Sequence, residues 1–483
     1  MRAVGNHDTS ARGGRHSETW LGWLAPLVFI ASAAALGAML KGQLQVPLVH
    51  PLTHFRFFDL RIYRRAAGVL SAGGPLYKAK LGRGLGFTYP PAAAAMFLAL
   101  RLLSVHRDEI AVTVLNVLLV AAGAHLALRL HRPDDDRRLA QFGVARLRRR
   151  RWVIAWLAAA AALWAEPVST AIGYGQIDVL IAALVVFDLA YSSTAPRRAD
   201  GTRAERPLAG VAIGVAAAII LTPLVFIPYL ALSGRWRMAL RAGSTFALSI
   251  LAELIIFPRD AWTYWIDRKF MDVTRVTGRL HLAGSGAADQ SLRGALLRFL
   301  PNLADQHQVW LASCLVVGSV GLLLAARASR RGDDAWGFLL TALTGLLISP
   351  VSWTHQWALA VVAVIGLVGS RGWSPVGALR AGLVTVFGLA AGRIWVVVAL
   401  GPGRQLSPGE LLLGDLYVIA AATTLAVAAV IDQRHGARAR PDTEAGATRR
   451  PALPEPAAQP TLAALSAGGG ELPALVGDAL LQS

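Results

Sequence analysis

The chain has 483 residues, of which 55% are hydrophobic and 16% are charged. Apolar runs of roughly 20 residues recur from end to end, which excludes a soluble protein and predicts an all-α, polytopic membrane protein. Lys and Arg exceed Asp and Glu by 19 charges. These basic residues cluster in short segments between the apolar runs, which favours membrane lipids over nucleic acid as their partners. Cys314 is the single cysteine, so intrachain disulfides are excluded.

The apolar runs, taken in chain order, predict the membrane segments. The first, from Trp20 to Leu40, follows three arginines, which predicts an uncleaved amino terminus on the cytoplasmic side. Pro223 predicts a turn that divides one long apolar stretch into two crossings. The expected segments lie at about 20–40, 110–130, 152–165, 176–194, 208–221, 223–233, 238–257, 306–326, 335–349, 357–370, 376–400 and 411–431.

The run 91–104 decides the orientation of everything after it. If this run crossed the membrane, the arginine-rich segments that end at Arg151 and Arg206 would both lie outside, against the positive-inside rule. We therefore expect it to lie in the outer interface or re-enter. This arrangement gives about 12 transmembrane helices. The expected organisation is a cytoplasmic segment 1–19, a transmembrane domain 20–431 and a disordered cytoplasmic tail 432–483, because the tail is rich in Ala, Pro and charge.

This topology places the polar segments together on the outer face, with interfacial helices in the first loop. They are 41–90, 165–176, 258–305 and 349–356. Polar groups gathered at one membrane boundary are typical of an interfacial site. We therefore expect chemistry on the extracytoplasmic side of a cell-membrane protein.

Asp59 is the first candidate, in the stretch "FFDLRIY" from Phe57 to Tyr63. An aspartate before a helix is a good amino-terminal cap, and on the residues alone capping is favoured here. Its two phenylalanine neighbours favour the other interpretation, because a desolvated carboxylate has a raised pKa and suits proton abstraction. His355 and Trp353 lie in "SPVSWTHQW", where the ordinary roles are an interfacial histidine and a membrane anchor.

The other candidates also have simple structural interpretations. Glu166 and Gln176 bracket a glycine-containing loop and could be solvated loop residues. "FTYPP", with Tyr89, could be a rigid turn. No GxGxxG or P-loop lies in a suitable context, and no Cys or His cluster has metal-ligand spacing, so we expect neither a cofactor nor a metal.

The ordered motifs resemble those of a known family. "DLRIYRRAAGVLSAGG", "FTYPPAAAAMFL", "EPVSTAIGYGQID", "GVAIGVAAAIILTP", "DQSLRG" and "LLISPVSWTHQW" follow one another between about residues 50 and 370, as in glycosyltransferase family 87. The resemblance implies a C-type membrane fold and polyprenyl-phosphate-mannose-dependent alpha-1,2-mannosyl transfer.

The resemblance also implies roles for single residues. Asp59 matches the acidic residue that acts as the general base, and inversion at the sugar needs only that one carboxylate. His355 matches the first histidine of the "SWxHH" pattern, as a group that binds the donor phosphate or positions the acceptor. The expected substrate-binding set is His355, Gln176, Tyr89, Tyr63, Glu166, Gln290, Arg61 and Trp353, with Ser291 beside Gln290.

Four positions depart from the family pattern. Gln356 replaces the second histidine, Asp289 the asparagine of "NQS", Asp178 the asparagine of "GQIN", and Ile220 a lysine often found before "LTP". They leave the sugar and the acceptor open.

Three hypotheses follow. The first is a mannosyltransferase that acts on a glycolipid or lipoglycan, with polyprenyl-phosphate mannose as donor. The second is arabinofuranosyl transfer from a similar donor. The third is a transporter or lipid flippase, which the lack of an internal repeat disfavours.

Overall fold

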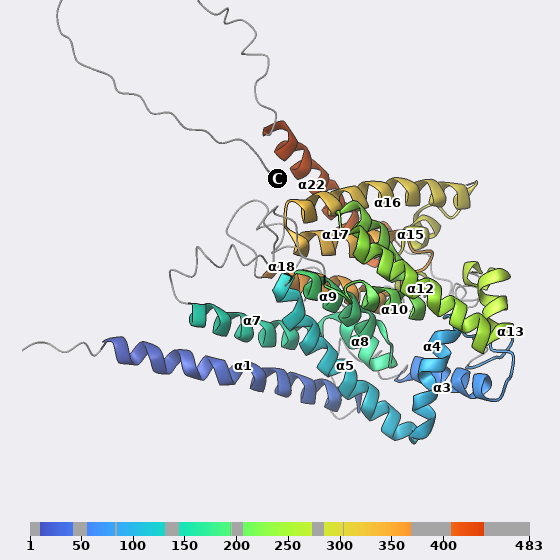
Figure 1. The fold of residues 1–483 in the computed structure, drawn as a ribbon, viewed down its shortest axis with the longest axis horizontal. Coiled ribbons are helices and arrows are strands. Elements are labelled where there is room, and N and C mark those ends of the chain that lie inside the picture. Colours follow the sequence, from blue (N-terminus) through green and yellow to red (C-terminus); the bar gives the residue numbers. More distant parts are fainter. Residues whose placement is uncertain are drawn as a thin grey trace, which may run out of the picture. The chain divides into compact units, whose positions relative to one another are not determined.

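The computed structural model describes residues 10–41, 56–82, 85–130, 144–193, 195, 206–272, 285–302, 304–368 and 407–438. Within these ranges the chain is helical and forms no named strand, only the isolated bridges Gly82–Leu85 and Asp289–Trp353. The predicted all-α class is therefore confirmed. The α-helices, drawn in Figure 1, are α1 (Ser10–Leu40), α3 (Phe58–Ser71), α4 (Pro91–Met96), α5 (Val105–Ala127), α7 (Val144–Trp164), α8 (Glu166–Tyr174), α9 (Asp178–Ser193), α10 (Val211–Ile219), α11 (Phe226–Leu232), α12 (Trp236–Ile256), α13 (Pro258–Ala261), α15 (Leu292–Phe299), α16 (Gln306–Arg330), α17 (Asp334–Ile348), α18 (Ala358–Val368), α21 (Pro408–Gly414) and α22 (Leu416–Arg438).

Five helices are long and apolar enough to cross a membrane, and α7 with α8 makes a sixth if that bent pair is one span. Each predicted segment within the described residues coincides with helical structure, whereas 376–400 lies outside them. The expected count of about 12 crossings is not confirmed. Several apolar helices are too short, since 9 residues in α10 extend only about 14 Å against a hydrocarbon core of about 30 Å.

The short apolar helices pack inside the protein. In α17, every residue from Asp334 to Leu347 is buried, as expected for a helix that is apolar on all sides. Its neighbour α16 approaches closely at Gly321, where an added Cβ would lie 2.0 Å from Thr344 Oγ1. Small residues at such crossings are typical of helix packing in membranes. Figure 1 shows α16 and α17 side by side.

The chain breaks after α10, as Pro223 predicted. Ile220 ends α10 in an extended conformation, and a 3₁₀ turn from Thr222 to Val225 leads into α11. The short run after "TYPP" forms α4 and a 3₁₀ helix from Phe97 to Leu102. Together they extend about 21 Å, less than a hydrocarbon core requires. Its non-spanning placement therefore remains a prediction that this length favours.

The predicted amphipathic helix in the first outer segment is α3. Its buried face is apolar except for the Tyr63 hydroxyl, and its Arg64 side chain donates to the carbonyl of Leu103 and pairs with Asp108 of α5. The positive-inside rule disfavours basic residues in a loop on the outer side, where this segment is predicted to lie. The pairing of Arg64 with Asp108 explains why an arginine is tolerated there. Figure 1 shows α3 and α4 close to α13, and the backbone N–H of Leu76 donates to Asp260 of α13 at 3.0 Å.

The segment 165–176, expected to be an outer loop, is the helix α8. It follows α7 after a bend of 67° at Ala165, where Pro167 stands in the first turn of the new helix. A proline is well accommodated there because the N–H groups of a first turn have no partner within the helix. Glu166 and Gln176 are 2% and 4% exposed, so the alternative interpretation that they are solvated loop residues is wrong.

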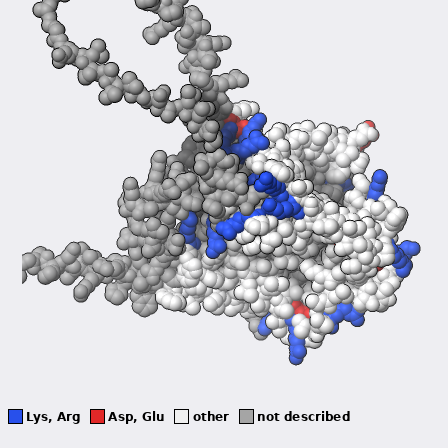
Figure 2. Space-filling view, in the orientation of Figure 1, with Lys and Arg blue, Asp and Glu red and all other residues white. Residues whose placement is uncertain are grey.

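Charge is distributed unevenly over the surface. In Figure 2 the visible face is largely uncharged, with Lys and Arg gathered toward its two ends. In α12 the arginines stand near its amino end, and the next one, Arg259, follows after the helix. A long uncharged belt between charged ends is what a helix in hydrocarbon requires.

The contacts within the chain divide it into two units, Met1–Asp432 and Gln433–Ser483. Two parts of the predicted organisation lie outside the described residues. They are 1–9 of the amino-terminal segment and 439–483 of the tail.

Candidate active site

The Asp59 carboxylate lies in the first turn of α3 and faces α8. Phe57, the residue before the helix, takes a left-handed conformation with φ 54°, and its N–H donates to Gly173 of α8 at 2.8 Å. Asp59 makes no capping hydrogen bond, and Oδ2 instead accepts from Gln176 Nε2 at 2.8 Å. The capping interpretation is therefore wrong. Phe57 stands at the start of the helix, and the Asp59 carboxylate accepts from Gln176 instead of capping the first turn.

Gln176 links three of the predicted site residues. Its Oε1 accepts from the hydroxyl of Tyr63 and, at 3.4 Å, from that of Tyr89, while its Nε2 donates to Asp59. The two tyrosine hydroxyls are also 3.3 Å apart. Asn116 of α5 donates to the backbone carbonyl of Gln176 at 3.2 Å and fixes its position from the other side. The structure thus brings together Asp59, Tyr63, Tyr89 and Gln176.

Gly175 allows this arrangement. It ends α8 in the left-handed region, with φ 70°, and an added Cβ would lie 2.7 Å from the Cβ of Leu60. Both the backbone conformation and the close approach of α3 favour glycine here. A larger residue would push Gln176 away from Asp59.

His355 forms a buried pair with Asp178. Its Nδ1 lies 2.8 Å from Asp178 Oδ2, and the two residues are 6% and 4% exposed. Asp178 begins α9, so its charge also lies at a helix amino terminus, which favours an anion. The ring of Tyr174 packs edge-on against His355. His355 therefore has a hydrogen-bond partner, as the simple interpretation expects, but that partner is a buried carboxylate close to Asp59.

The surroundings raise the pKa of Asp59 to about 6. Burial is the main cause, because it disfavours the charged form. The positive charge of His355 and the hydrogen bond from Gln176 oppose this effect, and the charge of Asp178 adds to it. Asp59 is thus ionised at neutral pH yet basic enough to accept a proton from a hydroxyl that is losing it.

Glu166 is buried beside this cluster but has its own partners. Oε1 accepts from the Thr170 hydroxyl at 2.8 Å and Oε2 from the Tyr417 hydroxyl at 3.0 Å. Its charge also acts on the pKa of His355. Tyr417, on α22, was missed by sequence reasoning, since nothing near it in the chain resembles a motif. Asp178 was noted only as a departure, although its place two residues after Gln176 was a usable signal.

Gln290 and Trp353 hold loops together. Gln290 Nε2 donates to the carbonyls of Ala287, at 2.6 Å, and Gly414, and its Oε1 accepts from the N–H of Tyr417 at 3.2 Å. Trp353 is half-buried and forms the isolated bridge with Asp289. Ser291 caps α15 by accepting from Gly294 at 3.0 Å. These contacts place "DQS" against "SPVSW", and they occupy the Gln290 amide with backbone groups.

We expect Gln290→Ala to lower stability more than substrate affinity. It leaves buried backbone groups without partners, each costing about 1–3 kcal/mol. The midpoint of thermal unfolding of the purified protein should fall clearly, while Gln306→Ala, which removes similar bonds from an exposed position, should change it little. An unchanged midpoint with a raised KM for substrate would contradict this role.

Arg61 does not join the cluster. Its side chain is 55% exposed and lies 3.3 Å from Glu109 of α5. Residues two apart on a helix do not share a face, so Arg61 points away from Asp59. The prediction that Arg61 contacts substrate beside Asp59 therefore gains no support from its position.

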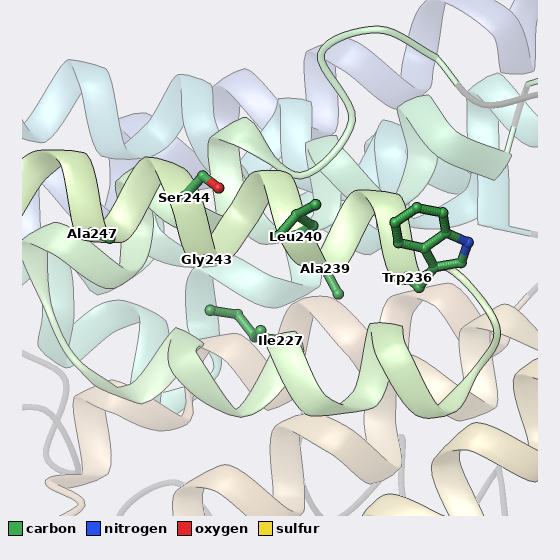
Figure 3. Close-up of a pocket in the computed structure, with 7 residues that line it drawn as sticks. All are labelled: Ile227, Trp236, Ala239, Leu240, Gly243, Ser244 and Ala247. Atoms are coloured by element: carbon green, nitrogen blue, oxygen red, sulfur yellow. The ribbon is translucent and has the colours of Figure 1, made fainter.

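One surface hollow lies elsewhere, between α11 and α12 (Figure 3). It has no ionisable lining group, so it cannot perform proton transfer, and its walls suit apolar chains such as lipid tails. In the described part of the chain no group of three or more His, Cys, Asp or Glu could hold a metal ion. The lining residues are Ile227, Trp236, Ala239, Leu240, Gly243, Ser244 and Ala247.

The fold and the cluster define a helical membrane protein with a carboxylate and a histidine–carboxylate pair held among short helices. A model of glycosyltransferase family 87 matches residues 87–350. A polyprenol-phosphate-mannose-dependent alpha-(1-2)-phosphatidylinositol mannoside mannosyltransferase of Mycobacterium tuberculosis is 34% identical over 321 residues, which cover 65% of this chain and 71% of the relative. The chain belongs to glycosyltransferase family 87, and the predicted family is confirmed.

Two further relatives agree. A protein of the same description from Mycolicibacterium smegmatis is 29% identical over 382 residues, 74% of this chain and 80% of the relative. A polyprenol-phosphate-mannose-dependent alpha-(1-2)-phosphatidylinositol pentamannoside mannosyltransferase of Mycobacterium tuberculosis is 28% identical over 385 residues, 76% of this chain and 80% of the relative. The family match begins at Phe87, so it includes Gln176 but not Asp59.

Proposed function

We propose that the protein transfers mannose from polyprenyl-phosphate mannose to a hydroxyl of a mannoside-bearing glycolipid, with inversion, on the extracytoplasmic face of the cell membrane. The observation that carries this proposal is the Asp59 carboxylate, held by Gln176 close to the buried His355–Asp178 pair. The family and the functions for which the relatives are named support the donor and the class of acceptor.

The proposed reaction needs one base. Asp59 takes the proton of the acceptor hydroxyl as that oxygen forms a bond to C1 of the sugar. The bond between C1 and the phosphate oxygen breaks, and its electron pair leaves with the lipid phosphate. Attack from the side opposite the phosphate converts a beta-linked donor into an alpha-linked product.

The leaving phosphate gains negative charge during this step, so a nearby positive group or donor lowers the barrier. His355 is the group whose positive charge acts on Asp59, and we assign it the role of receiving the charge on the phosphate. Tyr63 and Tyr89 offer hydroxyls beside the carboxylate for the sugar or acceptor. A lipid-linked donor needs no nucleotide pocket, because its tail is already held in the membrane.

The site's placement on the outer face depends on the distribution of basic residues. The arginine-rich segments ending at Arg151, Arg206 and Arg331 fall on one side if 91–104 does not cross. The proposed organisation keeps 20–431 as the catalytic membrane domain and 432–483 as a cytoplasmic tail.

We expect membranes containing the protein to transfer radiolabelled mannose from polyprenyl-phosphate mannose to phosphatidylinositol mannosides. Matched membranes without the protein are the control. Transfer only from a polyprenyl-phosphate arabinofuranose donor would show that the sugar is arabinofuranose and not mannose, while the class of reaction would stay as proposed. Absence of transfer from both donors would refute the proposal.

A further inference from the structure

The His355–Asp178 pair has a feature that the proposed reaction does not itself require. A neutral amide at position 178 could orient an imidazole equally well, but here the partner is a carboxylate. Both residues are buried, and burying an ion pair is costly unless its geometry is good. The 2.8 Å contact between Nδ1 and Oδ2 supplies that geometry.

The carboxylates that face His355 all favour its positive charge. Asp178 contacts it from α9, Asp59 faces it from α3, and Glu166 and Tyr174 face it from α8. Helix α18, which follows it, carries no titratable side chain among its residues. Burial by itself lowers the pKa of His355 and is the largest single effect. The charge and hydrogen bond of Asp178, with the charges of Asp59 and Glu166, together raise the pKa above its ordinary value.

Three other cations among the described residues are already paired with carboxylates. Arg61 pairs with Glu109, Lys269 pairs with Asp272 at 2.7 Å, and Arg298 pairs with Asp415. Among these groups His355 is therefore the one whose charge is directed at Asp59.

We infer that Asp178 is a positioning residue that keeps His355 protonated, so that the imidazolium is the fixed positive charge that receives the lipid phosphate as it leaves. The inference rests on the proposed function. The contact through Nδ1 leaves Nε2 as the nitrogen available to the phosphate. Asp178 is bound to His355 and contacts no reacting atom, so it acts mainly through the histidine. Its direct effect on the pKa of Asp59 is the smallest of those acting there.

The inference gives the pH profile a definite form. Activity requires Asp59 without its proton, which sets the acid limb, and His355 with its proton, which sets the alkaline limb. Removing the Asp178 charge destabilises the protonated histidine. Opposite charges at such short range shift a pKa by about 1–3 units, so the alkaline limb should move down by about that amount.

The test measures kcat/KM for the polyprenyl-phosphate sugar against pH in the wild-type protein and in Asp178→Asn. We expect the alkaline limb of the variant to fall by about 1–3 pH units, so that the loss of activity relative to the wild-type protein grows as the pH rises. Asp178→Glu, which keeps the charge, should leave that limb near its wild-type position even if its rate is lower.

Asp289→Asn is the matched control. It also replaces a buried carboxylate by asparagine, but Asp289 accepts from Ser352 and not from His355, so its alkaline limb should not move. An equal loss at every pH in Asp178→Asn, with both limbs in place, would assign Asp178 a merely structural role and overturn the inference. Inactivity of the wild-type protein itself would instead refute the proposed function.

Discussion

Replacing Asp59 with asparagine should lower kcat/KM for mannosyl transfer by about 10²–10⁴-fold, because general-base catalysis contributes that much. Asparagine keeps the size of the side chain, and its oxygen can still accept from Gln176 Nε2, so the local geometry is retained. What is lost is the ability to take a proton. The measurement is the initial rate of sugar transfer at matched amounts of folded protein.

Asp260→Asn is the control for this experiment. Asp260 is another buried carboxylate, it accepts from the N–H of Leu76, and it contacts none of the residues around Asp59 in the structure. The asparagine variant should retain most of the wild-type rate. If Asp59→Asn kept activity within a few fold, another group would have to be the base.

The second large effect is expected from Gln176→Glu, which places another carboxylate where an amide donates to Asp59. Two carboxylates at 2.8 Å cannot both ionise easily. The pKa of Asp59, which is about 6 beside the amide, therefore rises when the new carboxylate stands next to it. The base form exists only above that pKa. The acid limb of kcat/KM should therefore move from about pH 6 to a higher pH.

At pH 7 this shift should reduce activity by about 10-fold or more, since each pKa unit above the working pH costs a factor of ten in the base form. Raising the pH should recover part of the loss, which a misfolded protein would not do. Gln308→Glu adds the same charge at an exposed position on α16 and should leave the acid limb unchanged. An acid limb that stayed near its original pH in Gln176→Glu would contradict the assignment of that limb to Asp59.

Residue patterns within single segments of the sequence predicted much of the fold. The helix after Asp59 was predicted because apolar residues recur at helical spacing in "LRIYRRAAGVLSAGG", and α3 has that face buried. The break at Pro223 followed from the missing N–H of proline. The segment 165–176 was predicted as a loop because of its glycines and polar residues, yet burial against α3 and η9 (Thr354–Trp357) supports a helix there.

Composition, periodicity and short motifs determined the class of this protein, its helices, its family and the candidates Asp59, Gln176, Tyr89 and His355. These are local properties, set by a residue and its near neighbours. The tertiary structure alone decided which candidates meet, because those contacts join Asp59 to Gln176 across 117 residues, Asp178 to His355 across 177 and Glu166 to Tyr417 across 251. It also turned Arg61 toward Glu109 and the Gln290 amide toward backbone groups. Such pairings follow from how helices far apart in the chain pack together, which no periodicity within one helix encodes.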